Sequence, residues 1–182
     1  MNPPFDNAAE VVEAIRTVRQ ARHYSPEPVS AGDLETLLQV ARWTGSSRNT
    51  QPWHFIVVDD KDTLKAISQL RDPINWVAGA PLAIAIMLTG EAKLSEAYDE
   101  GRVTERLLVA ARMMGLGGGV AWFGDADQVK EGKRILGIPD ERTARSVVVL
   151  GHITSTKDTR PNANTGGRKP MDEIVSQNRS GG

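Results

Sequence analysis

The chain has 182 residues, 40% of them hydrophobic, so it is long enough and apolar enough to form a folded core. Its formal net charge of -1 excludes a global attraction to nucleic acid or to anionic membranes. The sequence has no cysteine, which excludes disulfides, thiolate zinc sites and cysteine nucleophiles. Its three histidines, His23, His54 and His152, lack the spacing of metal ligands, so we expect no metal site.

Neither the first residues nor the longest apolar run indicates a membrane or export signal. The first residues, MNPPFDNAAE, have no basic region followed by an apolar region, as a signal peptide would. The longest apolar run, VAGAPLAIAIML, is too short to span a bilayer and contains Pro81. These features predict a cytoplasmic protein with no membrane partner.

Hydrophobic periodicity predicts the elements of the N-terminal half. Asn7 and Glu10 have the spacing of a capping box and precede apolar residues at helical intervals. Ser30 predicts the start of a second helix, whose buried stripe would comprise Leu34, Leu37, Leu38 and Ala41. The following segments predict a strand over 54–60, a helix over 61–70 and a strand covered on both faces over 81–88.

The C-terminal half continues the alternation of helices and strands. Residues 90–98 are polar and predict a small lid, and a helix is expected from about Arg102 to Met114. Glycines at 115–119 end that helix and lead into a short strand; a helix over 127–136 and a buried strand over 144–153 follow. The pattern predicts an α/β or α+β fold, as one domain over 1–182 with an extended arm from 154.

A basic cluster lies near the end of the first predicted helix. The stretch RTVRQARHY places Arg16, Arg19 and Arg22 three residues apart. This spacing is compatible with a solvated helix face. It is also compatible with a phosphate site, because the planar guanidinium group can donate two parallel hydrogen bonds to an anion.

The junction SSRNTQPWHF, residues 46–55, contains an unusual number of hydrogen-bonding side chains. Ser46 and Ser47 offer hydroxyls, while Asn49 and Gln51 offer amides that both donate and accept. Such a set suits a planar heterocycle with alternating donors and acceptors. It could also tie down the loop, which Trp53 is large enough to anchor in the core.

Two further stretches are ambiguous on their own. GLGGG, residues 115–119, is not a dinucleotide fingerprint, because it follows a helix and has Val120 in place of the third glycine. Gly117, Gly118 and Gly119 could form a simple helix stop, or could let backbone N–H groups face a flat ligand. Arg168 and Lys169 stand in a polar tail. No GxSxG motif occurs, which argues against a serine hydrolase.

Taken in order, these four stretches resemble the nitroreductase family of FMN-dependent oxidoreductases. RTVRQARHY resembles the family's Arg-rich motif, with Tyr24 as its aromatic residue, and GSSRNTQPW resembles the family's PSSxNxQPW. GLGGG resembles the family's GLG stretch, and Arg168 matches the family's basic residue before a proline. The resemblance extends from about residue 11 to residue 176.

The resemblance implies an FMN site at the interface of a homodimer. Arg19, Gln20 and Arg22 would line the phosphate and ribityl side, Arg22 would also reach the N1/O2 edge of the ring, and Arg168 would close on the phosphate. Gly117, Gly118 and Gly119 would lie beside the N5 edge. The residues expected to approach FMN from the partner subunit are Ser46, Ser47, Asn49 and Gln51.

The family's fold is an α+β three-layer sandwich, with a mostly antiparallel sheet between helices and a C-terminal arm exchanged in the dimer. Its reaction implies ping-pong hydride transfer from NADH or NADPH through flavin N5 to a small acceptor such as a nitroaromatic or quinone. No side chain needs to act as a catalytic base. Dehalogenation, azoline oxidation, flavin fragmentation and non-catalytic flavin binding remain alternatives, and Trp122 could shape the substrate cavity or belong to the core.

Overall fold

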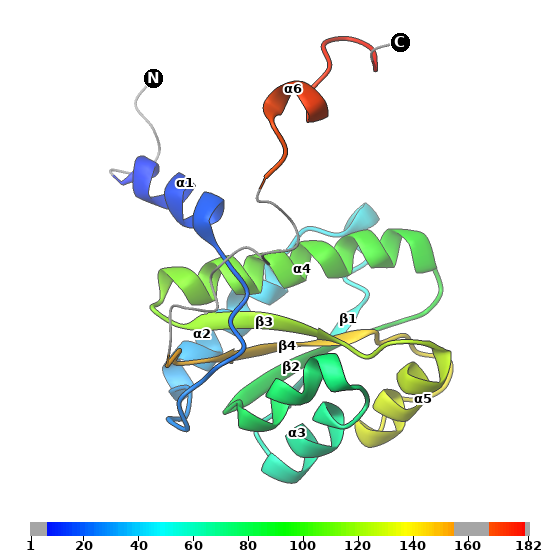
Figure 1. The fold of residues 1–182 in the computed structure, drawn as a ribbon. Helices are drawn as coiled ribbons and strands as arrows, with labels where there is room; N and C mark the ends of the chain where they lie inside the picture. Colours follow the sequence, from blue (N-terminus) through cyan, green and yellow to red (C-terminus); the bar gives the residue numbers. More distant parts are fainter. Residues whose placement is uncertain (1–6, 155–167, 181–182) are drawn as a thin grey trace.

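The computed structural model describes residues 7–154 and 168–180. Its centre is a sheet of four strands in the spatial order β1-β2-β4-β3, with every neighbouring pair antiparallel (Figure 1). The strands are β1 (Trp53–Val58), β2 (Leu82–Leu88), β3 (Gly117–Trp122) and β4 (Ser146–Gly151). The predicted α+β class with an antiparallel sheet between helices is confirmed.

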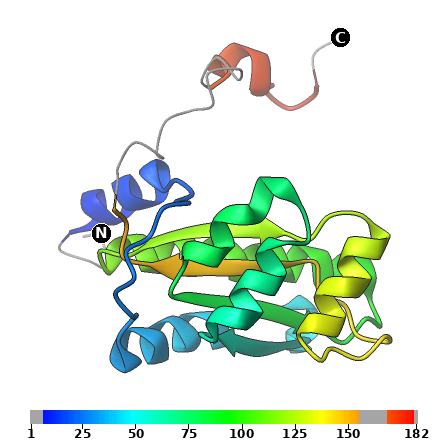
Figure 2. The same cartoon turned by 60° about the horizontal axis from the view of Figure 1, so that its bottom comes forward.

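Helices cover both faces of this sheet. One face carries α2 (Ala31–Arg42) and α4 (Lys93–Met113), and the other carries α3 (Lys61–Ser68), the 3-10 segment η2 (Asp72–Gly79) and α5 (Ala126–Ile135), as Figures 1 and 2 show. Strand β2 alternates between the two cores: Ala83 and Ala85 face α3, whereas Ile84 and Ile86 face α4. Its nearly continuous apolar sequence follows from burial on both sides.

The helix starts agree with the sequence in one case and differ in another. The Ser30 hydroxyl accepts a hydrogen bond from the Asp33 N–H and caps α2 as expected. Asn7 precedes α1 (Ala8–Thr17) but makes no side-chain capping bond, so the predicted capping box is wrong. Gly137, just after α5, has a φ of 65°, the left-handed conformation that glycine adopts readily beyond a helix end.

The predicted lid over 90–98 is wrong, because α4 already begins at Lys93. Three acidic side chains of its first turns, Glu96, Asp99 and Glu100, are buried. The Glu96 carboxylate accepts hydrogen bonds from the Thr89 hydroxyl and from the N–H groups of Gly90, Glu91 and Ala92. Tertiary partners therefore bury a face of the helix that reads as polar in the sequence.

Helix α1 and the short α6 (Met171–Ile174) rise away from the three-layer body in Figure 1. Neither contains a buried residue. Most of the predicted arm over 154–182 lies outside the described residues, which cover it only at 154 and over 168–180. Within the described part of the chain, no helix has the length and apolar character needed to cross a membrane.

Candidate functional site

The segment after α1, residues 18–24 and called here the basic segment, lies against strand β3. The N–H of Ala21 donates to the carbonyl of Gly118 at 2.8 Å, and the N–H of Val120 donates to Oε1 of Gln20 at 3.1 Å. The spacing of the arginines in the sequence is compatible with one helical face. Helix α1 ends at Thr17, however, so Arg19 and Arg22 lie beyond the helix and do not share a helical face with Arg16. The basic segment and the glycines, predicted separately as parts of one site, are neighbours.

The glycines of β3 have a steric role within the chain. They form part of the strand itself and not a turn before it. A Cβ atom on Gly119 would lie 2.4 Å from the carbonyl oxygen of Ala21, and one on Gly118 would lie 2.7 Å from Cδ2 of Leu108. Close approach by the backbone of the basic segment therefore requires glycine at 119, whereas at 118 the flexible end of the Leu108 side chain would have to shift.

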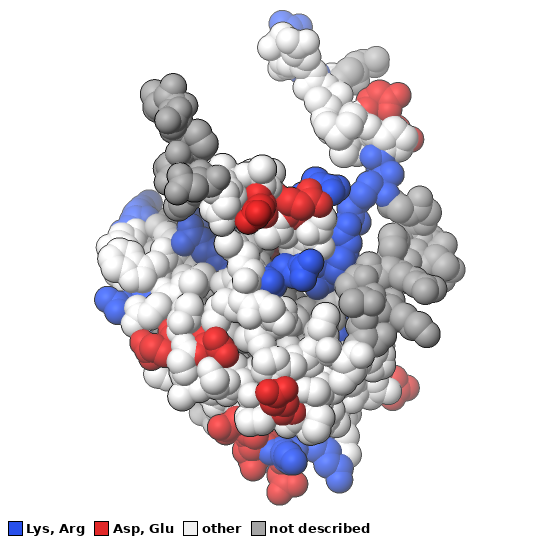
Figure 3. Space-filling view, turned by 90° about the vertical axis from the view of Figure 1, so that its left-hand side faces the viewer, with Lys and Arg blue, Asp and Glu red and all other residues white. Residues whose placement is uncertain are grey.

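A cavity of about 390 Å³ lies where α1, the basic segment, α4 and the C-terminal segment meet. Figure 3 shows basic side chains gathered on the face with α1 and the start of β3, beside acidic ones. The cavity is lined by Ile15, Arg16, Val18, Arg19, Gln20, Glu105, Leu108 and Arg168. Three of the predicted site residues are thus brought together, across almost 150 positions of the chain.

The three arginines of the basic cluster differ in whether other residues of the chain already bind their guanidinium groups. Nη2 of Arg16 forms an ion pair with Glu13 at 2.6 Å, which supports the surface role for this residue. Nη1 of Arg19 donates to the Val18 carbonyl at 2.8 Å, which fixes its orientation but leaves its charge without a carboxylate partner within the described residues. Arg22 is exposed and does not line the cavity.

The other predicted half of the site is the loop that precedes β1. Arg48, Asn49 and Gln51 have φ angles of 53°, 57° and 46°, which are unfavourable for residues with a Cβ atom. Two side-chain acceptors help to hold this conformation: Ser46 Oγ accepts from the Gln51 N–H at 2.8 Å, and Asp99 Oδ2 accepts from the Ser47 N–H at 3.0 Å. Strain supported in this way is typical of functional loops.

Part of the polar character of the loop is therefore structural. The hydroxyl of Ser46 ties the loop together, as the simpler interpretation predicts. Trp53 packs against the core on the α4 side and thus anchors the loop's exit. In contrast, the described residues provide no hydrogen-bond partner for the side-chain amides of Asn49 and Gln51. These two amides stay available for a ligand.

The two halves of the predicted site lie at diagonal corners of the sheet in one chain. The loop leads into Trp53, the first residue of edge strand β1, and the basic segment pairs with Gly118 at the start of edge strand β3. Val58, at the end of β1, pairs with Ala83 of β2, which pairs with Val149 of β4, which in turn pairs with Gly119 of β3. Trp53, at the start of β1, therefore lies toward the end of the sheet opposite the glycines. Three inter-strand spacings alone separate the edges by roughly 14 Å.

Comparison with known proteins decides the family. Residues 15–82 match the family model described as "Nitroreductase family". A protein of Archaeoglobus fulgidus named "Putative NADH dehydrogenase/NAD(P)H nitroreductase" is 35% identical over 158 residues, covering 82% of this chain and 88% of the relative. The chain belongs to the nitroreductase family.

Solved structures agree with this assignment at the level of the fold. An FMN-dependent nitroreductase from Clostridium difficile superimposes with a TM-score of 0.81 at 23% identity, over 93% of this chain and 99% of that one. The NADPH:FMN oxidoreductase of Vibrio harveyi, solved with NAD+, gives a TM-score of 0.82 at 21% identity, over 94% and 78%. Both have the nitroreductase fold seen here.

Trp122 lies at the end of β3, beyond the glycines of this nitroreductase-family chain. Its side chain is 53% exposed, so it is not a core residue. The guanidinium carbon of Arg71 lies 5.3 Å from the centre of the Trp122 ring, and the ring lines an open cavity of about 820 Å³. Trp122 therefore lies outside the core and lines this cavity, and its role in shaping the substrate cavity stays a prediction.

Three residues at the site were missed in the sequence. Asp99 holds the loop, Glu96 organises the turn before α4, and Arg48 faces a cavity beside both. Burial by itself would raise the pKa of Glu96, but the hydrogen bonds from Thr89 and three backbone N–H groups outweigh it and lower the pKa. The signal in the sequence that could have revealed Glu96 and Asp99 was the group of acidic residues within 91–100. A carboxylate that becomes buried needs hydrogen-bond donors nearby, so such a residue is a candidate for holding a neighbouring loop or turn.

Proposed function

We propose that this protein is an FMN-dependent oxidoreductase that takes electrons from NADH or NADPH and acts as a homodimer with FMN at the interface. Family membership supports the flavin chemistry, since relatives include proteins named FMN reductase [NAD(P)H] in Bacillus subtilis and NADPH-flavin oxidoreductase in Vibrio harveyi. The observation that carries the assignment is the cavity that joins Arg19 and Gln20 to Arg168.

This cavity fits the phosphate end of FMN. Guanidinium groups of Arg19 and Arg168 line it, and two such groups match the charge and planar geometry of a phosphate. Gln20, held against β3, would lie on the ribityl side, and Arg22, two residues further along the chain, would reach the N1/O2 edge of the ring. A cation beside the N1/O2 edge favours the acceptance of electrons by the ring.

The diagonal separation of the two halves supports a dimeric site. In its own chain, the loop before β1 cannot reach the cavity at Arg19. We therefore propose that FMN bound by a partner subunit is met by Ser46, Ser47, Asn49 and Gln51 of this loop. Exposed apolar side chains provide a surface for such a partner. On α1, α4 and α6 these are Val12, Ile15, Leu94, Tyr98, Met113, Met171 and Ile174.

FMN, when bound, supplies the transfer of hydride between the nicotinamide and the acceptor. The protein binds the cofactor, orients the two substrates and sets the electrostatics around them. None of the described side chains is required as a proton-abstracting base in this scheme. A nitroaromatic, a quinone or a similar flat acceptor is the proposed oxidant.

Absorbance spectroscopy of the purified protein tests this proposal. The expected result is a flavin spectrum, present on purification or after addition of FMN, which bleaches when NADH or NADPH is added without oxygen. Subsequent addition of a quinone should restore the bands. Absence of flavin binding even with excess FMN would overturn the proposal, whereas a bound flavin that neither nucleotide bleaches would leave only a flavin-binding protein.

A further inference from the structure

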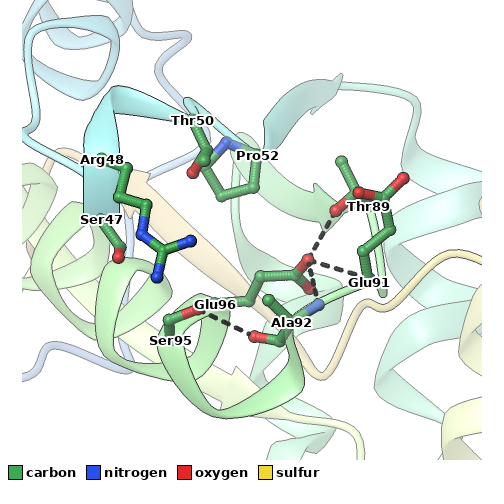
Figure 4. A pocket seen from close by; sticks show the side chains of 9 residues that line it. All are labelled: Ser47, Arg48, Thr50, Pro52, Thr89, Glu91, Ala92, Ser95 and Glu96. Atoms are coloured by element: carbon green, nitrogen blue, oxygen red, sulfur yellow. Dashed lines mark hydrogen bonds between the residues drawn. The ribbon is translucent and has the colours of Figure 1, made fainter.

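Arg48 is a cation without a partner in the described structure. It lies in the strained loop and lines a cavity of about 540 Å³ between this loop and the start of α4. Figure 4 shows its side chain reaching across the hollow toward Ser95 and Glu96. No ion pair or side-chain hydrogen bond involves Arg48 within the described residues.

The carboxylates at the same cavity do not neutralise Arg48. Both oxygens of Glu96 are taken up by the Thr89 hydroxyl and by backbone N–H groups, so its charge is already compensated. Glu91 is exposed, and its side chain has no partner among the described residues. The charge available to a ligand inside the hollow is therefore the guanidinium of Arg48, with Glu91 as an opposing charge on its wall.

The surroundings of Arg48 suit a polar ligand of small size. Hydroxyl groups of Ser47 and Thr50 come from the same loop and make no hydrogen bond to any residue that the structure describes. A volume of about 540 Å³ lies within the range of small-molecule sites. The buried carboxylate of Asp99, which holds the Ser47 N–H at 3.0 Å, fixes the loop backbone next to Arg48.

We propose that Arg48, with the hydroxyls of Ser47 and Thr50, forms a subsite for an anionic group on the molecule that exchanges electrons with FMN. This inference rests on the proposed function, because the same loop is the one that would meet the partner's flavin. The group recognised is a carboxylate or a phosphate, which a guanidinium can bind through two parallel hydrogen bonds. It is carried by the acceptor or by the ribose phosphate of NADPH.

Calorimetric titration of the FMN-loaded protein tests the subsite without relying on turnover. The probes are two pairs that differ in one anionic group: 4-nitrobenzoate with 4-nitrobenzyl alcohol, and NADP+ with NAD+. We expect tighter binding of the charged member of at least one pair. Arg48→Ala should lower that preference by roughly tenfold, the loss expected for a charge-assisted contact.

Two further variants make the result specific. Glu91→Gln removes the opposing charge and should increase the preference, whereas Arg134→Ala, in an exposed ion pair with Glu131 on α5, should leave it unchanged. The pair affected by Arg48→Ala identifies the source of the anion. Equal binding within both pairs, or a preference that survives Arg48→Ala, would overturn the subsite.

The same titrations separate this proposal from the proposed function. If the protein bleaches with NADH or NADPH but Arg48→Ala changes neither preference, the oxidoreductase stands and the subsite fails. If the flavin is not reduced but 4-nitrobenzoate binding depends on Arg48, the anion subsite stands and the oxidoreductase fails.

Discussion

Gln20 and Val120 are 100 positions apart, yet the side-chain oxygen of Gln20 accepts a hydrogen bond from the backbone N–H of Val120 at 3.1 Å. With the bond from Ala21 to Gly118, this contact makes the basic segment a neighbour of β3. The segment that would hold the cofactor phosphate is thereby placed in register with the glycine strand. The alignment of the proposed site therefore depends on the Gln20 side chain together with the backbone bond from Ala21 to Gly118.

Gln20→Ala should loosen that alignment. Loss of one hydrogen bond to a partly accessible N–H should cost about 0.5–1 kcal/mol of unfolding free energy, with weaker FMN binding. Gln20→Glu retains an acceptor oxygen and should preserve most of the stability. Chemical denaturation and FMN titration measure both effects, with Gln39→Ala on the surface of α2 as the control. Equal FMN affinity in Gln20→Ala and wild type would contradict the alignment role.

Substitutions of the arginines test the proposed phosphate end. Arg19→Ala and Arg168→Ala should each weaken FMN binding by roughly tenfold or more, because each removes a charge-assisted contact to the phosphate. Arg22→Ala should weaken binding and also lower the flavin reduction potential. Equilibrium dialysis and a reductive titration supply the two readouts. Full flavin content in all three purified variants would refute the assignment.

Asp99 provides a test of the strained loop. Asp99→Ala removes the buried acceptor of the Ser47 N–H and a partner of Arg102, so unfolding free energy should fall by about 2 kcal/mol. Because the loop would contact the partner's FMN, flavin affinity should fall with it. Glu131→Ala, which removes an exposed carboxylate on α5, is the control. A loss of stability with unchanged flavin affinity would limit Asp99 to a structural role.

The dimer can be tested through α1. Val12 is 63% exposed on a helix that contains no buried residue, and it does not line the cavity at Arg19, so Val12→Asp should barely change the stability of the monomer. If α1 packs on a partner, the buried charge would favour dissociation and would release FMN. Analytical ultracentrifugation with absorbance detection follows both quantities together. Lys130→Asp on α5 should have neither effect, and a monomeric wild-type protein would contradict the shared site.

Two glutamates of α4 predict opposite pH dependences of stability. The pKa of Glu96 is lowered from 4.5, since hydrogen bonds outweigh burial, so its charged form stabilises the fold above 4.5 and this contribution is lost as pH falls. Burial raises the pKa of Glu100 from 4.5, although Arg145 opposes the shift. Its ionisation therefore costs stability as pH rises above 4.5.

Glu96→Gln and Glu100→Gln should consequently diverge in denaturation experiments across this pH range. Relative to wild type, Glu96→Gln should become less stable as pH rises toward 4.5, and Glu100→Gln should become more favourable as pH rises beyond 4.5. Parallel profiles for the two variants would show that their environments do not differ as described.

The sequence by itself determined the parts that depend on local patterns. Apolar runs predicted β1, β2 and β4, and periodicity predicted α2, α3 and α5, with a capping serine for α2, because each pattern is complete within one segment. The four motifs in order indicated the family and its cofactor before any contact was known. The same residues also suggested which side chains belong to the proposed site.

Other features were decided only by the tertiary structure, because contacts between distant segments outweigh the local hydrophobic pattern there. The first turns of α4 contain charged residues that become buried because Thr89, Ser47 and Arg145 supply partners from elsewhere. Glycines carry no alternating pattern, so only the pairing with β4 shows that the short strand predicted after the glycines already begins at Gly117. The strand order β1-β2-β4-β3 places the loop before β1 and the basic segment beside β3 at diagonal corners of the sheet. This order could not be read from the sequence, because the pairing of distant strands is set by the packed core and not by neighbours along the chain.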